Sequence, residues 1–120
     1  MFDHIGLNVR DVPASMGFYE AALAPLGYRL LRSSDTRAIF SAGDKPEFIV
    51  IGREPLGGST HLAFAAADRP TVDAFYAAGL AAGGTDNGGP GIREQYHASY
   101  YAAFVFDPDG NNIEAVCHVG

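Results

Sequence analysis

Two histidines, His4 and His61, occupy matching places in the chain and could bind a metal ion together. His4 lies in the segment Asp-His-Ile-Gly-Leu (3–7), and His61 lies in the similar segment Thr-His-Leu-Ala-Phe (60–64), 61 − 4 = 57 positions later. The same shift aligns further identical residues: Pro13 with Pro70, Phe18 with Phe75, Tyr19 with Tyr76, Leu23 with Leu80 and Gly27 with Gly84. Such repeats are typical of paired supersecondary units that bury a face against each other. We therefore expect the two histidines to occupy equivalent positions in one fold and to share a site.

A carboxylate near the C-terminus, Glu114, is predicted to lie on the same face of the sheet as the two histidines. Successive side chains of a strand point to opposite faces. His4, His61 and Glu114 each oppose the most apolar face of their own segment. The apolar residues are Ile5, Leu7 and Val9, then Leu62 and Phe64, then Ile113, Ala115 and Cys117. If helices cover the apolar faces, the three polar side chains project from the uncovered, concave face of a curved sheet.

Two imidazoles and one carboxylate form a ligand set that holds a divalent ion and leaves coordination positions open. Open positions are typical of catalytic metal sites, where water or substrate oxygens complete the shell. We therefore predict His4, His61 and Glu114 as ligands of Fe, Mn, Ni or Zn, and the ligand types leave the choice among these metals open. Taken singly, each residue also has a structural interpretation, as a hydrogen-bonded histidine or as a paired or surface glutamate.

Four residues before the penultimate predicted strand could assist proton transfer. Tyr96, His97, Tyr100 and Tyr101 cluster where a long loop could border the concave face, and His97 is the leading candidate. Aromatic packing with the hydroxyl groups turned to solvent is the alternative for the tyrosines. Arg93 could pair with an anionic substrate or could be an ordinary surface residue.

Hydrophobic periodicity and turn residues predict two units of strand, helix and further strands. In the first unit, Asp11 caps a helix over about 12–24, with Pro13 in its first turn. The strands of this unit are expected at 3–9, 28–32, 37–41 and 47–52, and residues 53–59 have the composition of a linker. The second unit is expected to contain strand 60–66, helix 69–82, a flexible Gly-rich surface loop over 83–91, strand 99–106, a hairpin turn at 107–110 and strand 111–119.

Composition excludes several classes of function. The 120 residues fit a single domain with two modules, about 1–57 and 58–120. Eight Lys and Arg against fourteen Asp and Glu give a net charge of −6, which argues against a nucleic-acid partner. No segment has the length or the flanks of a membrane span or a signal peptide, so we expect a cytoplasmic protein with no membrane partner. The single cysteine, Cys117, is expected to be a small buried hydrophobic residue.

The chain resembles the vicinal oxygen chelate superfamily of glyoxalase I, extradiol dioxygenases, fosfomycin-resistance transferases and bleomycin-resistance proteins. The resemblance spans essentially the whole chain, and its most specific part is the segment Asp-Pro-Asp-Gly-Asn-Asn-Ile-Glu (107–114). It also rests on segments 3–9, 15–26 and 60–64. It implies an α+β fold in which two tandem βαβββ modules form a cupped mixed sheet with helices on the outer face. It also implies metal ligands at the positions of His4, His61 and Glu114, a small-molecule substrate or ligand, and a homodimer.

The first module departs from the family at the position expected to match Glu114. Aligning segment 48–52 with segment 112–116 pairs Val50 with Glu114, whereas glyoxalase I has a second glutamate in this region. Glu47, three residues away, is expected on the opposite face of its strand. Glyoxalase I activity is therefore disfavoured. A metal-dependent enzyme similar to extradiol dioxygenases, or a related lyase or transferase, is favoured over a metal-free protein that sequesters a ligand as the bleomycin-resistance members do. A scaffold with no present ligand is the third possibility.

Overall fold

The computed structural model describes residues 2–53 and 60–119 and has the α+β architecture expected from the sequence. The predicted linker 53–59 lies, except for Arg53, outside the described residues. The first module contains β1 (Ile5–Val9), α1 (Val12–Leu23), a short 3₁₀ helix (Ala24–Leu26), β2 (Arg29–Ser33), β3 (Arg37–Ser41) and β4 (Phe48–Gly52). The second contains β5 (His61–Ala65), α2 (Arg69–Ala81), β6 (Thr85–Asp86), β7 (Gly91–Ile92), β8 (Tyr101–Phe106) and β9 (Asn112–Cys117). The fold class is thereby confirmed.

Both helices begin with the same capping device. The side chain of Asp11 accepts a hydrogen bond from the backbone N–H of Ala14 at 3.1 Å, which satisfies one of the free donors of the first turn of α1. Asp68 caps α2 in the same way, through the backbone N–H of Thr71 at 2.9 Å. The 3₁₀ helix that follows α1 ends at Gly27, whose φ of 90° is in the left-handed region that glycine adopts without strain.

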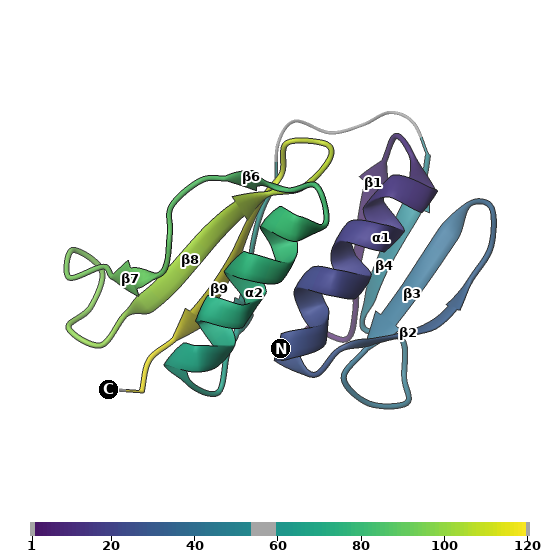
Figure 1. Cartoon of the computed structure of the whole chain (residues 1–120). Helices are drawn as coiled ribbons and strands as arrows, with labels where there is room; N and C mark the ends of the chain where they lie inside the picture. Colours follow the sequence, from purple (N-terminus) through teal and green to yellow (C-terminus); the bar gives the residue numbers. More distant parts are fainter. Residues whose placement is uncertain (1, 54–59, 120) are drawn as a thin grey trace.

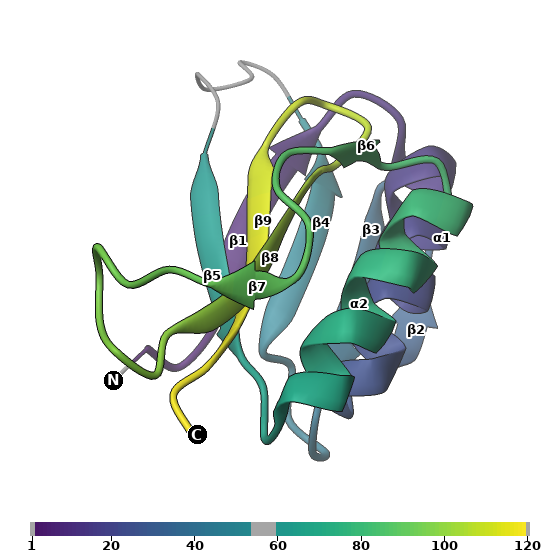
Figure 2. The same cartoon turned by 60° about the vertical axis from the view of Figure 1, so that its left-hand side comes forward.

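The strands form two hydrogen-bonded sheets instead of one continuous sheet. Their orders are β1-β4-β3-β2 and β5-β9-β8-β6, with β7 also paired to β8. The first strand of each module runs parallel to the last, and the other pairs are antiparallel. Helices α1 and α2 pack against each other on one side of the molecule, and both sheets lie on the other side (Figures 1 and 2). Each sheet therefore keeps one face that no helix covers.

The expected flexible loop over 83–91 contains short strand segments, so that prediction is wrong in part. Thr85 and Asp86 form β6, and Gly91 opens β7, and both segments pair with β8. The glycine content hid this pairing because glycine is depleted in strands. Gly84 shows what the glycines do instead: a Cβ there would lie 2.5 Å from Val105. Close packing, not flexibility, requires glycine at this position.

A buried carboxylate, Asp107, holds the two modules together. The hydroxyl of Tyr19 on α1 donates to Asp107 Oδ2 at 2.6 Å, and both residues are buried. The backbone N–H of Asn111 donates to Oδ1 at 2.8 Å, and its side-chain amide donates to Oδ2 at 2.9 Å. The 107–110 turn between β8 and β9 is therefore tied to the helix of the other module.

Among the described residues, no helix is both long and apolar enough to cross a membrane.

Candidate functional site

His61 and Glu114 come together on the uncovered face of the second sheet. Glu114 on β9 is in register with Ala63 on the neighbouring strand β5, and His61 lies two residues before Ala63 on the same face. Nε2 of His61 lies 2.8 Å from Oε1 of Glu114. The glutamate side chain is only 1% exposed, whereas the imidazole is 54% exposed. A buried carboxylate is thus paired with an imidazole that reaches the surface.

Tyr100 forms a hydrogen bond with the other oxygen of the Glu114 carboxylate. Its hydroxyl donates a short hydrogen bond to Oε2 of Glu114. Burial of the phenol, together with the hydrogen bond to Glu114 and the charge of that group, raises the pKa of Tyr100 to about 12. The phenol therefore stays protonated at neutral pH and acts as a donor. Tyr100 was one of four candidates from the sequence, and it is the one that contacts a predicted ligand directly.

Tyr100 belongs to a cluster of four aromatic side chains, of which the sequence predicted Tyr96, His97 and Tyr100 itself. The ring of Tyr96 lies 5.0 Å from that of Tyr100, and the ring of His118 lies 5.2 Å from it on another side. The ring of His97 is 6.1 Å from His118 and does not contact Glu114 in the structure. Sequence reasoning missed His118, although the alternation of Glu114, Val116 and His118 along the chain was a signal for it.

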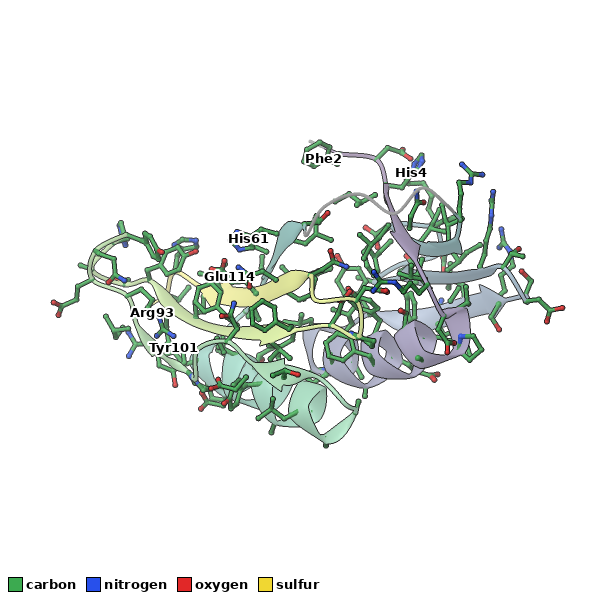
Figure 3. The ribbon with its side chains drawn as sticks, turned by 90° about the horizontal axis from the view of Figure 1, so that it is seen from above. Phe2, His4, His61, Arg93, Tyr101 and Glu114 are labelled. Carbon is green, nitrogen blue, oxygen red and sulfur yellow. The ribbon has the colours of Figure 1, made fainter. Side chains whose placement is uncertain are left out.

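Tyr101 and Arg93 lie outside this cluster. Because Tyr101 follows Tyr100 directly, its side chain points to the opposite face, where its hydroxyl donates to Asp73 on α2 at 2.6 Å (Figure 3). The structure therefore does not bring Tyr101 together with Glu114, unlike Tyr100. The guanidinium group of Arg93 lies 5.3 Å from the ring centre of Phe104 and donates to the carbonyl of Gly89 at 2.8 Å. These contacts support a structural role for Arg93.

His4 does not reach the pair of His61 and Glu114 within one chain. Its Nδ1 lies 2.7 Å from Asp3 Oδ1, and its side chain is 56% exposed. His4 lines a cavity together with residues 62–65 of β5 and stands well apart from His61 on the side of the molecule away from the helices (Figure 3). Within residues 2–53 and 60–119, no three His, Cys, Asp or Glu side chains form a group that could hold a metal. The expected joint site therefore does not form inside one chain, because equivalent positions in two modules need not be adjacent in space.

The strand register corrects the alignment of the two modules. Gly6, two residues after His4, is in register with Ile49, and Ala63, two residues after His61, is in register with Glu114. Ile49 is therefore the counterpart of Glu114, and the predicted pairing with Val50 is wrong by one residue. Val50 is fully buried in the core. The conclusion that the first module offers no carboxylate at this position is unchanged.

Glu47 was expected on the face opposite the counterpart of Glu114. Because that counterpart is Ile49 and not Val50, Glu47, two residues before Ile49, lies on the same face as the counterpart. It directly precedes β4 and lines the cavity that contains His4. Its Oε1 accepts hydrogen bonds from the backbone N–H of Ala42 at 2.7 Å and from the hydroxyl of Ser41 at 2.9 Å. These bonds lower the pKa of Glu47, the backbone bond most strongly.

The donor atoms at the second sheet fit part of a divalent metal site. Imidazole nitrogen and carboxylate oxygen are ligands for Fe, Mn, Ni and Zn, and here the two atoms face each other at the edge of solvent. Tyr100 holds Oε2, so Oε1 is the oxygen that a metal would meet. Hydrogen bonding from a second group commonly orients a ligating carboxylate in this way.

The architecture and this donor pair define a class of protein: a paired βαβββ domain with a histidine and a carboxylate on an open sheet face. The family model described as "Glyoxalase/Bleomycin resistance protein/Dioxygenase superfamily" matches residues 1–115, so the chain belongs to this superfamily. The recognition from sequence is confirmed.

Solved structures agree with this assignment. A glyoxalase/bleomycin resistance protein from Albidiferax ferrireducens is 34% identical, with a TM-score of 0.83 and 98% of each chain covered. A glyoxalase/bleomycin resistance protein/dioxygenase family enzyme from Burkholderia phytofirmans is 19% identical, with a TM-score of 0.75 and 97% of each chain covered. A lactoylglutathione lyase from Agrobacterium tumefaciens is 18% identical, with a TM-score of 0.69, covering 98% of this chain and 92% of its own. The last two show the fold alone. No curated protein matches the chain at a significant level.

Proposed function

We propose that this protein is a divalent-metal-dependent enzyme that acts on a small substrate chelated through two adjacent oxygens. His61 and Glu114 of one copy and His4 of a second copy are the proposed metal ligands, within a homodimer. The observation that carries the proposal is the buried carboxylate of Glu114, whose two oxygens are divided between a half-exposed imidazole and a protonated phenol.

The burial of Glu114 supports a ligand role because burying a carboxylate costs free energy unless its charge is compensated. The side chain is 1% exposed, and its hydrogen-bond partners in the structure are His61 and Tyr100. Neither partner carries a permanent positive charge. A cation beside Oε1 would supply the missing compensation, which is the chemistry that a divalent ion provides.

A second copy is proposed as the source of His4 because the histidine and the pair of His61 and Glu114 are separate on one chain but lie on the same side of the molecule (Figure 3). The side chains of His4 and His61 are both more than half exposed, so each can meet a group from another copy. Two copies related by a two-fold axis would form two such sites, each completed by the partner.

In this arrangement each side chain has a definite task. A divalent ion, when bound, would polarise the two chelating oxygens of the substrate. Tyr100 would hold Glu114 through Oε2 and keep Oε1 directed at the ligand position. Tyr96, whose ring contacts that of Tyr100, and His97, whose ring contacts that of His118, are the groups that could exchange a proton with a substrate above the metal.

Three protein ligands favour chemistry that needs free coordination positions. Ile49 occupies the position in the first module that Glu114 occupies in the second, so the first module supplies no carboxylate there as a fourth ligand. This supports an activity similar to that of extradiol dioxygenases, or to a related lyase or transferase, over that of glyoxalase I. A metal-free ligand-binding function of the bleomycin-resistance type is the second candidate, because His61 and Glu114 also satisfy each other directly at 2.8 Å.

Metal titration of the purified protein with Co²⁺ and Zn²⁺ tests the proposal. We expect wild type to bind about one ion per chain, and His61→Ala and Glu114→Gln to lose most of the affinity, as removal of a ligand does. His97→Ala, which removes an imidazole outside the proposed ligand set, is the matched control and should bind normally. Failure of wild type to bind any divalent ion would overturn the enzyme proposal and favour the metal-free function.

A mixing experiment tests the shared site. His4→Ala and Glu114→Gln homodimers should each lack tight metal binding. A mixed dimer has one intact site, with His4 from one chain and His61 and Glu114 from the other. After mixing and refolding, half of the dimers are mixed and each has one of its two sites intact. Metal content should therefore return to about a quarter of the wild-type value. If His4 acted within its own chain, mixing would restore none.

A further inference from the structure

A cavity at the junction of the two modules contains a carboxylate and aromatic rings to which the metal proposal gives no role. Its volume is about 320 Å³, within the range of small-molecule sites. It lies where the segment before β1 and the start of β4 meet β5, and we name it the Glu47 cavity. Its lining includes Asp3, Tyr28, Glu47, Phe48 and Phe64. It does not include His61 or Glu114.

Three aromatic rings give the Glu47 cavity an apolar wall. The ring centre of Phe64 lies 5.6 Å from that of Phe48 and 5.6 Å from that of Tyr28, and both pairs meet edge to face. The contacts join β5 of the second module to the first module, so the rings are fixed by packing from both sides. An apolar body of the size of one ring could replace water against this wall.

The polar residues that line the Glu47 cavity are two carboxylates, one imidazole and one phenol: Asp3, Glu47, His4 and Tyr28. Asp3 and Glu47 both line it, and no Lys or Arg is among its described lining residues. The Oδ2 atom of Asp3 lies 2.6 Å from Nζ of Lys45, so this charge is compensated from outside the cavity. The charge of Lys45 also acts on Glu47 and lowers its pKa, but no ion pair joins the two side chains among the described residues. Oε1 of Glu47 accepts the hydrogen bonds from Ser41 and Ala42, which leaves Oε2 as the oxygen available to a ligand.

Glu47 is held ionised and in place. The N–H of Ala42 and the hydroxyl of Ser41 bind its Oε1, which fixes the carboxylate and keeps it charged. Its charge, with burial as the larger cause, raises the pKa of Tyr28, so that hydroxyl stays neutral. A fixed negative group beside aromatic faces is the combination that recognises an organic ammonium, through a charge-assisted hydrogen bond and cation–π attraction.

We propose that the Glu47 cavity binds a small organic cation, a primary ammonium group on an aromatic or aliphatic body, with the ammonium on Oε2 of Glu47 and the apolar body against Phe48 and Phe64. The proposal does not rest on the metal site, because its argument uses neither His61 nor Glu114. His4, a proposed metal ligand, also lines the cavity, but the argument gives it no role in binding the ammonium.

Three probes of similar size and different charge test the proposal on wild-type protein. Titrations of 2-phenylethylammonium, 2-phenylethanol and phenylacetate are followed by NMR, with shifts expected at Tyr28, Phe48 and Phe64. We expect the ammonium to bind at least tenfold more tightly than the alcohol, because a charge-assisted hydrogen bond strengthens binding by about tenfold or more. Equal binding of the ammonium and the alcohol, or shifts located elsewhere, would overturn the proposal.

A pair of variants assigns the charge. Glu47→Gln keeps a carbonyl oxygen that can accept from Ser41 and Ala42 but replaces the free oxygen with an amide donor. It should weaken binding of the ammonium about tenfold and leave that of the alcohol unchanged. Glu20→Gln, which removes the same charge at an exposed position on α1, is the matched control. If both variants weaken ammonium binding equally, the effect is one of net charge and the site assignment is refuted.

Discussion

Removal of the Tyr19 hydroxyl should destabilise the protein strongly, although the ring contacts remain. This hydroxyl donates to Asp107 Oδ2 at 2.6 Å, and the exposed fractions are 0% for Tyr19 and 4% for Asp107. Burial is the main cause that raises the pKa of Tyr19, and the Asp107 charge adds to it, so the phenol remains a donor at every pH of interest. In Tyr19→Phe, Oδ2 keeps only the amide of Asn111 as a side-chain donor.

The expected loss follows from the charge and the burial. Hydrogen bonds to charged groups contribute about 1.5–3 kcal/mol, so we expect the free energy of unfolding to fall by about 2 kcal/mol. The unfolding entropy of 120 residues is about 0.25 kcal/mol/K at about 2.1 cal/mol/K per residue. The Tm should therefore fall by about 8 °C.

Urea denaturation and calorimetry at one fixed protein concentration measure this loss, because the stability of an associating chain depends on concentration. Tyr76→Phe is the matched control: it removes the same atom from a hydroxyl that donates to Asp86 at 2.9 Å on the exposed surface. We expect it to cost less than about 0.5 kcal/mol. A Tyr19→Phe variant no less stable than Tyr76→Phe would refute the view that the Asp107 turn ties the two modules together.

Three further outcomes follow from the packing and from Tyr100. Gly84→Ala should cost about 1–3 kcal/mol in urea denaturation, because its Cβ would lie 2.5 Å from Val105 and 2.6 Å from Phe18; an unchanged midpoint would contradict this. Gly17→Ala, with no atom within 4 Å of the new Cβ in the interior of α1, should stabilise by about 0.4–1 kcal/mol in the same assay. Since the pKa of Tyr100 is raised to about 12, its hydrogen bond should contribute full stability below pH 10 and lose it as the pH rises through 12. The difference in stability between wild type and Tyr100→Phe should therefore shrink over that interval, and a constant difference would contradict the assignment.

The alternation of side chains predicted the local geometry because it depends only on neighbours along a strand. The core residues Leu7 and Val9 are buried opposite His4, and Ile113 and Ala115 are buried opposite Glu114. The contact between His61 and Glu114 followed from the same parity once β5 and β9 are adjacent.

Properties that depend on pairing between distant segments could not be read in this way. The register of β1 against β4 moved the counterpart of Glu114 from Val50 to Ile49, because a sequence alignment of two short apolar segments does not fix how each pairs with its neighbour. Tyr100 and Tyr101 were predicted together as members of one cluster, and only the start of β8 decides which of them faces Glu114. The contribution of Asp107 to the joining of the modules was hidden for the same reason, since its partner Tyr19 is 88 residues away.

The position of His4 connects the repeat to the proposed dimer. The repeat places one histidine at the start of each module, and the packing of α1 on α2 sets the two modules side by side with their open faces on the same side (Figure 2). Under the proposal, each chain presents two separate half-sites: His4, just before β1 of the first sheet, and the pair of His61 and Glu114 on the second sheet. Within one chain, the contact between the helices and the bond between Tyr19 and Asp107 stabilise the arrangement that separates them. A two-fold dimer can join both at once, since its symmetry brings each half-site of one copy to the complementary half-site of the other. If the proposed site is shared between two copies, metal binding and dimerisation must be coupled. Adding Zn²⁺ should then tighten the dimer of wild type but not that of His4→Ala, as sedimentation velocity at low protein concentration would measure.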